Sequence, residues 1–472
     1  MATRDAVRPI AREEILRQQA IAREIRERPD RPLTYHLVTY GCQMNAHDSQ
    51  ALAGMLEDMG MAPEADREKA GLILFNTCCI RDNAERRAMG NIVFTRKIKR
   101  VRPELLVGVC GCMAQQEGFQ ERLSRRYPHV DFSFGPGEIY QLPQRLLDAM
   151  EGRREQAFCR GEDSTLYEGL PVLRSLPFFA YQTVMYGCDN FCSYCVVPLV
   201  RGRERSRELR QIVSEAQRLV DEGVQEIMLL GQNVNSYGRD TGGPRFEDLL
   251  RALGQTGIRR LRFMTSHPKD LSDELIAEMA RNPAVCPHLH LPAQSGSDRM
   301  LAAMNRKYTR DWYLERVRAL RQAIPHIGLT SDLIVAFPGE TEEDFEQTLS
   351  LARQVRFDSA FTFIYSPRSG TAAARLPGRI DPEVARERIL RLIALQEGIT
   401  REVLRGLVGQ TASVLAEGLS KRDPGQLTGK TGRGIACNFS ADPGRIGQIV
   451  PALITGQGSK TLKARQIEKE NP

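Results

Sequence analysis

The chain has 472 residues, of which 41% are hydrophobic and 26% charged, and its formal net charge is +7. This composition is typical of a globular protein with two or three domains, and the absence of any long apolar run excludes a bilayer-spanning segment and predicts a cytoplasmic location. The 11 cysteines are spread along the chain, which favours metal binding over a dense disulfide framework.

Residues 1–32 form a charged N-terminal extension with eight arginines and six acidic residues. Ile15, Ile21 and Ile25 recur at loosely helical spacing, which predicts a solvated or frayed helix. The acidic residues argue against a mitochondrial transit peptide, which would be poor in them.

Residues 33–151 have the pattern of a doubly wound parallel α/β domain. Strand-like runs occur at 35–40, 71–76 and 105–109, and helical segments separate them. Residues 152–173 are polar and lack periodicity, so we expect a linker there, in which Cys159 has no special role.

Each of the three strand-like runs ends in cysteine, namely Cys42, Cys78 with Cys79, and Cys110 with Cys112. Because the carboxyl ends of parallel strands share one edge of the sheet, thiols from distant positions could converge on an iron–sulfur cluster there. The competing interpretation is that these cysteines are small buried hydrophobic residues. We assign Cys110 to the strand interior and Cys79 to a role other than ligand.

Residues 174–404 alternate between strands and helices. Strands are expected at 180–186, 226–230, 261–265, 288–292, 329–336 and 359–365, with helices at 208–222, 312–324 and 342–354 among others. Six βα units are too few for a closed eight-stranded barrel, so we expect a partial (β/α)6 barrel with its active face at the carboxyl ends of the strands.

A loop after the first of these strands contains Cys188, Cys192 and Cys195. A structural zinc site needs four ligands, and one disulfide among three cysteines would leave one thiol unpaired. A cubane cluster has four irons, so three thiolates leave one iron open to bind another molecule. The alternative is that this loop contains three ordinary buried thiols that bind no metal.

Polar residues follow several of the later strands and suggest a pocket on the same face. They are Gly231, Gln232, Asn233, Ser266, Gln294 and Ser295, with Asp332 inside its own strand. The arginine-rich run 201–207 next to the cysteine loop is expected to contact phosphates, although a solvated helix start is the plain alternative. For His267 a structural role is favoured over metal ligation.

Residues 407–470 contain short β-like runs at 411–416, 434–439 and 446–454, punctuated by glycine, with an excess of basic residues. This pattern predicts a small antiparallel β-barrel of the oligonucleotide-binding type. A barrel whose charge only keeps it soluble is an equal alternative on this segment alone.

Taken together, these motifs resemble the radical S-adenosylmethionine (SAM) enzymes of the methylthiotransferase family, and most closely the bacterial tRNA methylthiotransferases. The resemblance rests on Tyr186–Pro198 and Arg201–Arg207, supported by motifs at 41–45, 76–78, 111–112, 230–238, 265–268, 291–297, 305–309 and 337–340. It implies a methylthiotransferase domain, a radical SAM core and a C-terminal TRAM domain that binds RNA.

The resemblance implies two [4Fe–4S] clusters, one on Cys188, Cys192 and Cys195, where SAM is cleaved, and an auxiliary one on Cys42, Cys78 and Cys112, which carries the sulfur. Cys79 departs from the family pattern and could compete for an iron. SAM contacts are expected from Tyr194, Gly231, Gln232, Asn233, Ser266, Gln294, Ser295 and Asp332.

The implied reaction is methylthiolation at C2 of N6-isopentenyladenosine at position 37 of tRNA, using two SAM molecules per product. Implied partners are the tRNA anticodon stem-loop, an electron donor such as flavodoxin or ferredoxin, and cluster-assembly or carrier proteins, with the enzyme acting as a monomer. The alternatives are a sister enzyme acting on threonylcarbamoyl-adenosine or on a ribosomal-protein aspartate, and a non-catalytic iron–sulfur RNA-binding regulator.

Overall fold

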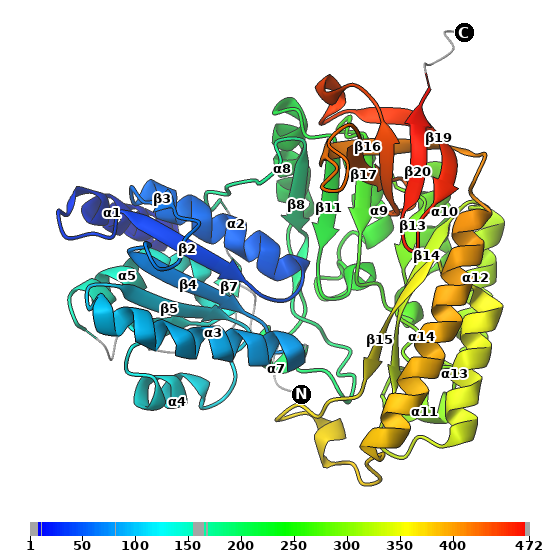
Figure 1. Cartoon of the computed structure of the whole chain (residues 1–472), viewed down its shortest axis with the longest axis horizontal. Coiled ribbons are helices and arrows are strands. Elements are labelled where there is room, and N and C mark those ends of the chain that lie inside the picture. The colour runs from blue at the N-terminus through cyan, green and yellow to red at the C-terminus, as the bar shows by residue number, and fades with distance from the viewer. Residues whose placement is uncertain (1–7, 11, 81, 154–164, 167–168, 468–472) are drawn as a thin grey trace. The chain divides into compact units, whose positions relative to one another are not determined.

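The structure is a computed structural model that describes residues 8–10, 12–80, 82–153, 165–166 and 169–467 (Figure 1). The chain divides into two compact units. The N-terminal unit comprises residues 1–175, 186–189 and 195–205, and the C-terminal unit comprises residues 176–185, 190–194 and 206–472. The cysteine loop after the first core strand therefore contributes residues to both units. Most of the expected linker, including Cys159, lies outside the described residues.

The N-terminal unit is built on a five-stranded parallel sheet with strand order β3-β2-β4-β5-β6. Its strands are β2 (Thr34–Thr39), β3 (Ala62–Pro63), β4 (Leu72–Thr77), β5 (Leu106–Gly111) and β6 (Phe132–Phe134). The chain adds β3 on one side of β2 and then β4, β5 and β6 on the other, so the strand order changes direction between β2 and β4. Doubly wound folds bind ligands at such a switch point. Strands β3 and β6 were not expected from the sequence, because two and three residues are too few to carry a periodicity.

Helices cover both faces of this sheet (Figure 1). On one face lie α1 (Arg12–Glu27), α2 (Gln43–Asp58) and α5 (Leu142–Met150), and on the other α3 (Asp82–Val101) and α4 (Phe119–Arg126). Helix α1 is packed rather than solvated, because Ile21, Ala22 and Ile25 are buried. Its apolar positions are few, which is why its sequence suggested a frayed helix. The short strands β1 (Arg8–Pro9) and β7 (Thr165–Leu166) pair in parallel.

The C-terminal unit contains the expected partial barrel as two three-stranded parallel sheets, β8-β11-β12 and β13-β14-β15. A parallel bridge between Leu261 and Val285 continues the first sheet toward the second. The strands are β8 (Phe179–Thr183), β11 (Glu226–Leu230), β12 (Arg260–Phe263), β13 (His288–His290), β14 (Gly328–Val335) and β15 (Ser359–Ile364). Strand β8 ends earlier than expected, at Thr183, where its pairing with β11 stops. The short elements β9 (Met185–Tyr186), α7 (Val197–Val200) and β10 (Arg205–Ser206) follow.

Amphipathic helices form the outer layer of the partial barrel. They are α8 (Leu209–Asp221), α9 (Phe246–Gly254), α10 (Asp273–Arg281), α11 (Asp298–Ala303), α12 (Arg310–Ala323), α13 (Glu342–Val355) and α14 (Pro382–Arg405). Ile212, Ala216 and Leu219 illustrate the pattern, since they recur at helical spacing along α8 and are buried. Helices α12, α13 and α14 lie side by side along the outer edge of the unit (Figure 1).

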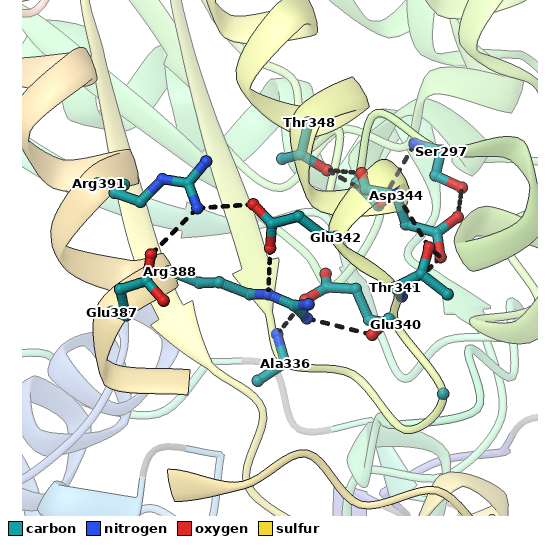
Figure 2. A network of polar contacts seen from close by, with 12 residues as sticks. Ser297, Ala336, Glu340, Thr341, Glu342, Asp344, Thr348, Glu387, Arg388 and Arg391 are labelled. Atoms are coloured by element: carbon teal, nitrogen blue, oxygen red, sulfur yellow. Dashed lines mark hydrogen bonds and ion pairs between the residues drawn. The ribbon is translucent and has the colours of Figure 1, made fainter. Parts of the chain in front are cut away.

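A capping network fixes the start of α13 and the preceding loop (Figure 2). Thr341 caps the helix, since its side chain accepts from the Asp344 backbone N–H while Asp344 accepts from the Thr341 N–H at 2.8 Å. Directly before Thr341, the buried Glu340 carboxylate accepts from Ala336 N and from Arg388 on α14 at 2.7 and 2.8 Å. Burial raises the pKa of Glu340 although Arg388 opposes the shift. Helix α14 is thereby tied to the end of β14.

The C-terminal segment forms the expected small barrel, closed by five strands in the order β16-β17-β18-β20-β19. Contrary to expectation, it is not antiparallel throughout, because β18 and β20 pair in parallel. The strands are β16 (Thr411–Leu419), β17 (Leu427–Thr431), β18 (Ala436–Ser440), β19 (Ile449–Gln457) and β20 (Leu462–Gln466), of which β17 and β20 were not expected. Buried arginines join the barrel to the partial barrel, because Arg260 and Arg262 pair with Glu226 and donate to Ser413 O and Gly432 O. Within the described chain, no helix is long and apolar enough to cross a membrane.

Candidate metal and cofactor sites

Three cysteines lie at the carboxyl edge of the N-terminal sheet, around the switch point. Cys42 precedes α2 directly, Cys78 follows β4 and Cys112 follows β5. The backbone N–H of Cys112 donates to Thr77 O at 3.0 Å, which joins the ends of β4 and β5. Cys110 is fully buried inside β5, as expected. The topology therefore brings the predicted triad to one edge.

A buried amide, that of Asn45, connects the members of this triad. Its Oδ1 accepts from Cys42 Sγ at 3.8 Å and from Cys112 Sγ at 4.0 Å. Its Nδ2 donates to Tyr40 O at 2.9 Å and to Thr77 O at 2.8 Å, the ends of two neighbouring strands. The Asn45 side chain thus holds two of the thiols at fixed places relative to the sheet.

Cys78 approaches the same amide from the other side. A Cβ placed on Gly41 would lie 2.8 Å from Cys78 Sγ and 3.4 Å from Asn45 Nδ2. Since Gly41 also has a φ of +112°, a conformation rare for other residues, glycine is required there. Cys79 belongs to the hydrophobic core beneath, yet its thiol hydrogen-bonds to Cys112 and lowers the pKa of that thiol. Cys78 thus lies beside Gly41 and Asn45 while Cys79 contacts Cys112, so both of these adjacent cysteines lie near the proposed triad.

Arg201 brings a positive charge to the cysteine edge. It is buried, and its Nη2 donates to Asn45 Oδ1 at 2.9 Å and to Asp48 Oδ2 at 2.8 Å. Burial raises the pKa of Cys42, whereas the charge of Arg201 opposes that shift and also lowers the pKa of Cys112. A cation beside several thiols favours their ionised, metal-binding form.

The arginine-rich run does not present its side chains to phosphate as the sequence suggested. Arg205 donates to Arg201 O at 3.0 Å, and Arg207 donates to Thr183 O at 2.6 Å and pairs with Glu215. Both are buried, as is Arg201, while the exposed Arg203 pairs with Asp189 at 2.7 Å. Internal carbonyls and carboxylates satisfy these guanidinium groups because the segment folds back into the protein.

The loop of Cys188, Cys192 and Cys195 is held by separate contacts in each unit. In the N-terminal unit, Cys188 N donates to Gly202 O at 3.2 Å, and a Cβ on Gly187 would lie only 2.0 Å from Arg203 O. In the C-terminal unit, Ser193 O accepts from Ala373 N at 2.8 Å, and Tyr194 packs against the cluster that contains Met300, Met304 and Phe337. Cys188 and Cys192 are each 9% exposed.

Most of the residues expected to contact SAM lie at the strand ends of the C-terminal unit, whereas Asp332 lies inside β14 and Tyr194 in the cysteine loop. Two of these residues form hydrogen bonds within the fold. Asn233 donates to Asp270 at 2.7 Å and accepts from His267 N at 3.0 Å. Ser295 Oγ lies 3.3 Å from Thr348 Oγ1 on α13. Gln294, with a φ of +66°, uses its backbone to bridge β14, so only its side chain remains for a ligand.

Other polar groups at this edge are buried without protein partners. Within the described residues, Ser266 Oγ, His267 Nε2 and both polar atoms of the Asn235 side chain have no hydrogen-bond partner. They lie near Gly231, whose carbonyl accepts from Thr265 Oγ1 at 2.8 Å. Asp332 Oδ1 lies 3.6 Å from His290 Nε2. Burial, followed by the charge of Arg306, lowers the pKa of His267, so its ring is neutral. Unpartnered buried polar atoms fit a polar cofactor such as SAM.

The free thiols of the cysteine sites are of the kind that ligates iron–sulfur clusters. Across the described ranges, no three histidine, cysteine, aspartate or glutamate side chains lie close enough together to hold one metal ion. A cubane cluster distributes its ligands over several irons, so its thiolates stand farther apart than those around one zinc. The Asn45 oxygen, which two of the thiols share as acceptor, and the positive charge of Arg201 can serve thiolates that stand this far apart.

Three family models match three separate stretches of the chain. Residues 183–352 match the model of the radical SAM superfamily, residues 34–135 that of the uncharacterized protein family UPF0004, and residues 405–467 that of the TRAM domain. A tRNA-2-methylthio-N(6)-dimethylallyladenosine synthase from Alkaliphilus oremlandii is 47% identical over 92% of this chain and 93% of its own. The synthase of the same name from a Thermoanaerobacter species is 45% identical over 97% of this chain and 98% of its own.

This chain belongs to the family of these synthases. It is therefore a radical SAM enzyme of the methylthiotransferase type, and it uses an iron–sulfur cluster and SAM. The family resemblance inferred from the sequence is confirmed, as are the radical SAM core and the TRAM barrel.

A solved structure gives independent support for the fold. The radical SAM methyltransferase TsrM from Kitasatospora setae, solved with cobalamin and a [4Fe–4S] cluster, has a TM-score of 0.50 and 16% identity, and it covers 72% of this chain and 77% of its own. At that identity the likeness concerns the fold alone. It includes the strand-rich architecture into which this family member places its cysteine loop.

The sequence named Asn45, Arg201 and Arg306 only as parts of motifs, and it predicted none of their contacts at the cysteine sites. Asn45 lies three residues after Cys42, on the first turn of α2, which was an available signal. The other two reach their sites from 156 and 114 residues away in the chain, counted to Asn45 and to Cys192 respectively. No local pattern reports such contacts.

Proposed function

We propose that this protein adds a methylthio group to C2 of N6-dimethylallyladenosine, also called N6-isopentenyladenosine, at position 37 of tRNA. The observation that carries the proposal is the 45% identity with the named synthase over 97% of this chain and 98% of that protein. An alignment of this extent includes both cysteine sites and the barrel, so it supports a shared reaction rather than a shared domain.

Two [4Fe–4S] clusters are proposed. Cys188, Cys192 and Cys195 would hold one and Cys42, Cys78 and Cys112 the other, while Tyr194, Gly231, Gln232, Asn233, Ser266, Gln294, Ser295 and Asp332 line the SAM site. When bound, the first cluster and SAM supply the radical that removes hydrogen from C2, and the second cluster supplies the sulfur. The buried, unpartnered Ser266 Oγ and His267 Nε2 support this assignment of the SAM site.

The chain's own residues prepare these sites. Asn45 orients Cys42 and Cys112 through one oxygen atom, and Arg201 offsets the negative charge of the thiolates. Neutral His267 offers one imidazole nitrogen to a ligand without adding charge beside Arg306. Each contact fixes a ligand or a charge before the cofactors bind, which is the preorganisation that radical chemistry requires.

The barrel is proposed to bind the anticodon stem-loop of tRNA. Its strand β20 carries exposed Lys463 and Arg465 on either side of buried Ala464, a pattern suited to a phosphate backbone. The target adenine would leave its stacked position to reach the SAM site, as bases in RNA loops can. We further propose a cytoplasmic monomer that takes electrons from a flavodoxin or ferredoxin and clusters from assembly or carrier proteins.

Mass spectrometry of tRNA nucleosides from cells that lack this protein tests the proposal. The methylthio form of N6-dimethylallyladenosine should disappear, its unmethylthiolated precursor should accumulate, and the intact gene should restore the product. Loss of methylthiolated threonylcarbamoyl-adenosine instead, or of a modified ribosomal-protein aspartate, would assign the chain to a sister activity. Unchanged profiles in all three would leave a non-catalytic regulator as the better description.

A further inference from the structure

The loop between α11 and α12 holds the segment around Cys192. Asn305 Nδ2 donates to Phe191 O at 2.8 Å, while Ser193 N donates to Met304 O at 3.0 Å and Ser193 Oγ to Ala303 O at 2.8 Å. Cys192 therefore stands between two residues that are both anchored to the same loop. All these residues belong to the C-terminal unit.

Arg306, in the middle of this loop, reaches Cys192 itself. Its Nη1 donates to Cys192 Sγ at 3.4 Å, its Nη2 to Pro292 O at 2.9 Å and its Nε to Tyr308 Oη at 3.1 Å. The guanidinium carbon lies 5.2 Å from the centre of the Tyr308 ring, and the residue is 4% exposed. The neighbours Asn305 and Lys307 both have left-handed backbones, with φ of 57° and 62°, which aim the arginine inward.

The charge of this guanidinium is not matched by a carboxylate. Among the described residues, Arg306 forms no ion pair, and its partners are a sulfur, a carbonyl and a phenol. A buried charge without a counter-charge is costly. Cys192 is the partner that a bound cluster would make anionic, because as a cluster ligand it would be a thiolate. The positive charge of Arg306 is therefore balanced only when an electron-rich group is bound at the cysteine loop.

We propose that Arg306 is a positioning residue of the radical SAM cluster that raises its reduction potential by donating an N–H···S hydrogen bond to Cys192 and supplying a buried positive charge. The inference rests on the proposed function, since it assumes that the Cys192 loop binds a cluster. Reduction adds one negative charge to the cluster, and a nearby cation stabilises that state more than the oxidised one. Hydrogen bonds to sulfur and local charge are among the factors that set such potentials.

The test is a redox titration of the reconstituted cluster, followed by electron paramagnetic resonance, without tRNA. The auxiliary cluster is silenced by combining Cys42→Ala, Cys78→Ala and Cys112→Ala, so that the signal comes from one site. In this background Arg306→Gln should lower the ratio of reduced to oxidised cluster about tenfold at a fixed potential, which corresponds to about 59 mV for one electron.

Two further variants separate charge from geometry. Arg306→Lys keeps the charge but loses the planar fork, so its potential should fall between those of wild type and Arg306→Gln. Lys307→Gln removes the same charge from the adjacent, exposed position and should leave the potential unchanged because water screens it. Equal potentials in wild type and Arg306→Gln, or equal shifts in Arg306→Gln and Lys307→Gln, would overturn the proposal.

A loss of folding must not be mistaken for a redox effect. The thermal midpoint of the cluster-free protein is therefore measured for each variant, together with the iron content after reconstitution. If Arg306→Gln retains no cluster, Arg306→Lys decides the matter, and an unshifted potential in that variant would refute the proposal. If the triple-alanine background binds no iron at all, the assignment of Cys188, Cys192 and Cys195 fails, which is a failure of the proposed function.

Discussion

At the scale of single residues, the two cysteine triads have different expected roles, which their variants should separate. Cys188→Ala should abolish release of 5′-deoxyadenosine from SAM but leave tRNA binding intact, because the barrel is untouched. Cys42→Ala should keep that release, at least to within a few fold of wild type, and yield no methylthio product. Both quantities are measured by chromatography of the reaction mixture.

The barrel cysteine Cys437, which is also buried, provides the matched control for these variants. Cys437→Ala should form both products, since it removes a buried thiol that lies far along the chain from either triad. Continued 5′-deoxyadenosine release by Cys188→Ala, or full product formation by Cys42→Ala, would contradict the assigned roles.

Asn45 is the residue whose importance emerges only from contacts, and its loss should affect the auxiliary site alone. Asn45→Ala removes the shared acceptor of Cys42 and Cys112 and the amide donor to the carbonyls of Tyr40 and Thr77, of which Thr77 O keeps its bond from Cys112 N. We expect iron content after reconstitution to fall toward that of one cluster, in line with the roughly 10- to 100-fold losses in metal affinity for such supporting residues. Asn91→Ala, which removes an amide bonded to the Tyr40 hydroxyl, should retain both clusters. Full iron in Asn45→Ala would show that Asn45 is dispensable.

At the scale of elements, the polar contacts at the start of α13 should make the free energy of unfolding depend on pH in the acid range. Asp344 accepts hydrogen bonds from Ser297 at 2.6 Å and from Thr341 (Figure 2). It also pairs with Arg299. Burial would raise the pKa of Asp344, but these contacts outweigh it and lower the pKa from 3.8 to about 2. The folded-state pKa lies below the unfolded one, so this stabilisation is present above about pH 4 and is lost as the pH falls toward 2.

Urea unfolding of the cluster-free protein between pH 2 and 6 measures this contribution. Asp344→Asn should remove about 2 kcal/mol of pH-dependent stability. Glu343→Gln, at an exposed position on the same helical turn, should preserve the wild-type profile. Parallel pH profiles for wild type and Asp344→Asn would show that Asp344 does not supply the dependence.

At the scale of the whole molecule, the barrel is expected to supply most of the affinity for tRNA. Each phosphate contact by a lysine or arginine releases counterions, so the double variant Lys463→Gln with Arg465→Gln should weaken binding and reduce the slope of affinity against salt by about one per side chain. Filter binding of the anticodon stem-loop over a range of salt concentrations measures both effects. Arg218→Gln, exposed on α8, should change neither. An unchanged slope in the double variant would place the RNA contacts elsewhere.

The sequence alone was sufficient where local patterns carry the information. Strand Glu226–Leu230 was predicted to the residue, because a short apolar run bounded by polar turns specifies a buried parallel strand. The triads were also evident, since cysteine spacing and strand ends are local features. Strands β3 and β6 were too short to predict, and α1 was misjudged as solvated because its few apolar residues still suffice to pack one face.

Only the tertiary structure decided what surrounds the cysteines. The contacts of Arg201 with Asn45 and of Arg306 with Cys192 join residues 156 and 114 positions apart, and neither arginine differs in its local sequence from an exposed one. The same holds for the neighbours of Cys78 and Cys79, because Cys78 lies beside Gly41 whereas Cys79 contacts Cys112. Sequence alone predicted which cysteines would bind the proposed clusters, whereas the fold determined which charges and hydrogen bonds act on those cysteines, because these depend on burial and on partners that only the folded chain brings together.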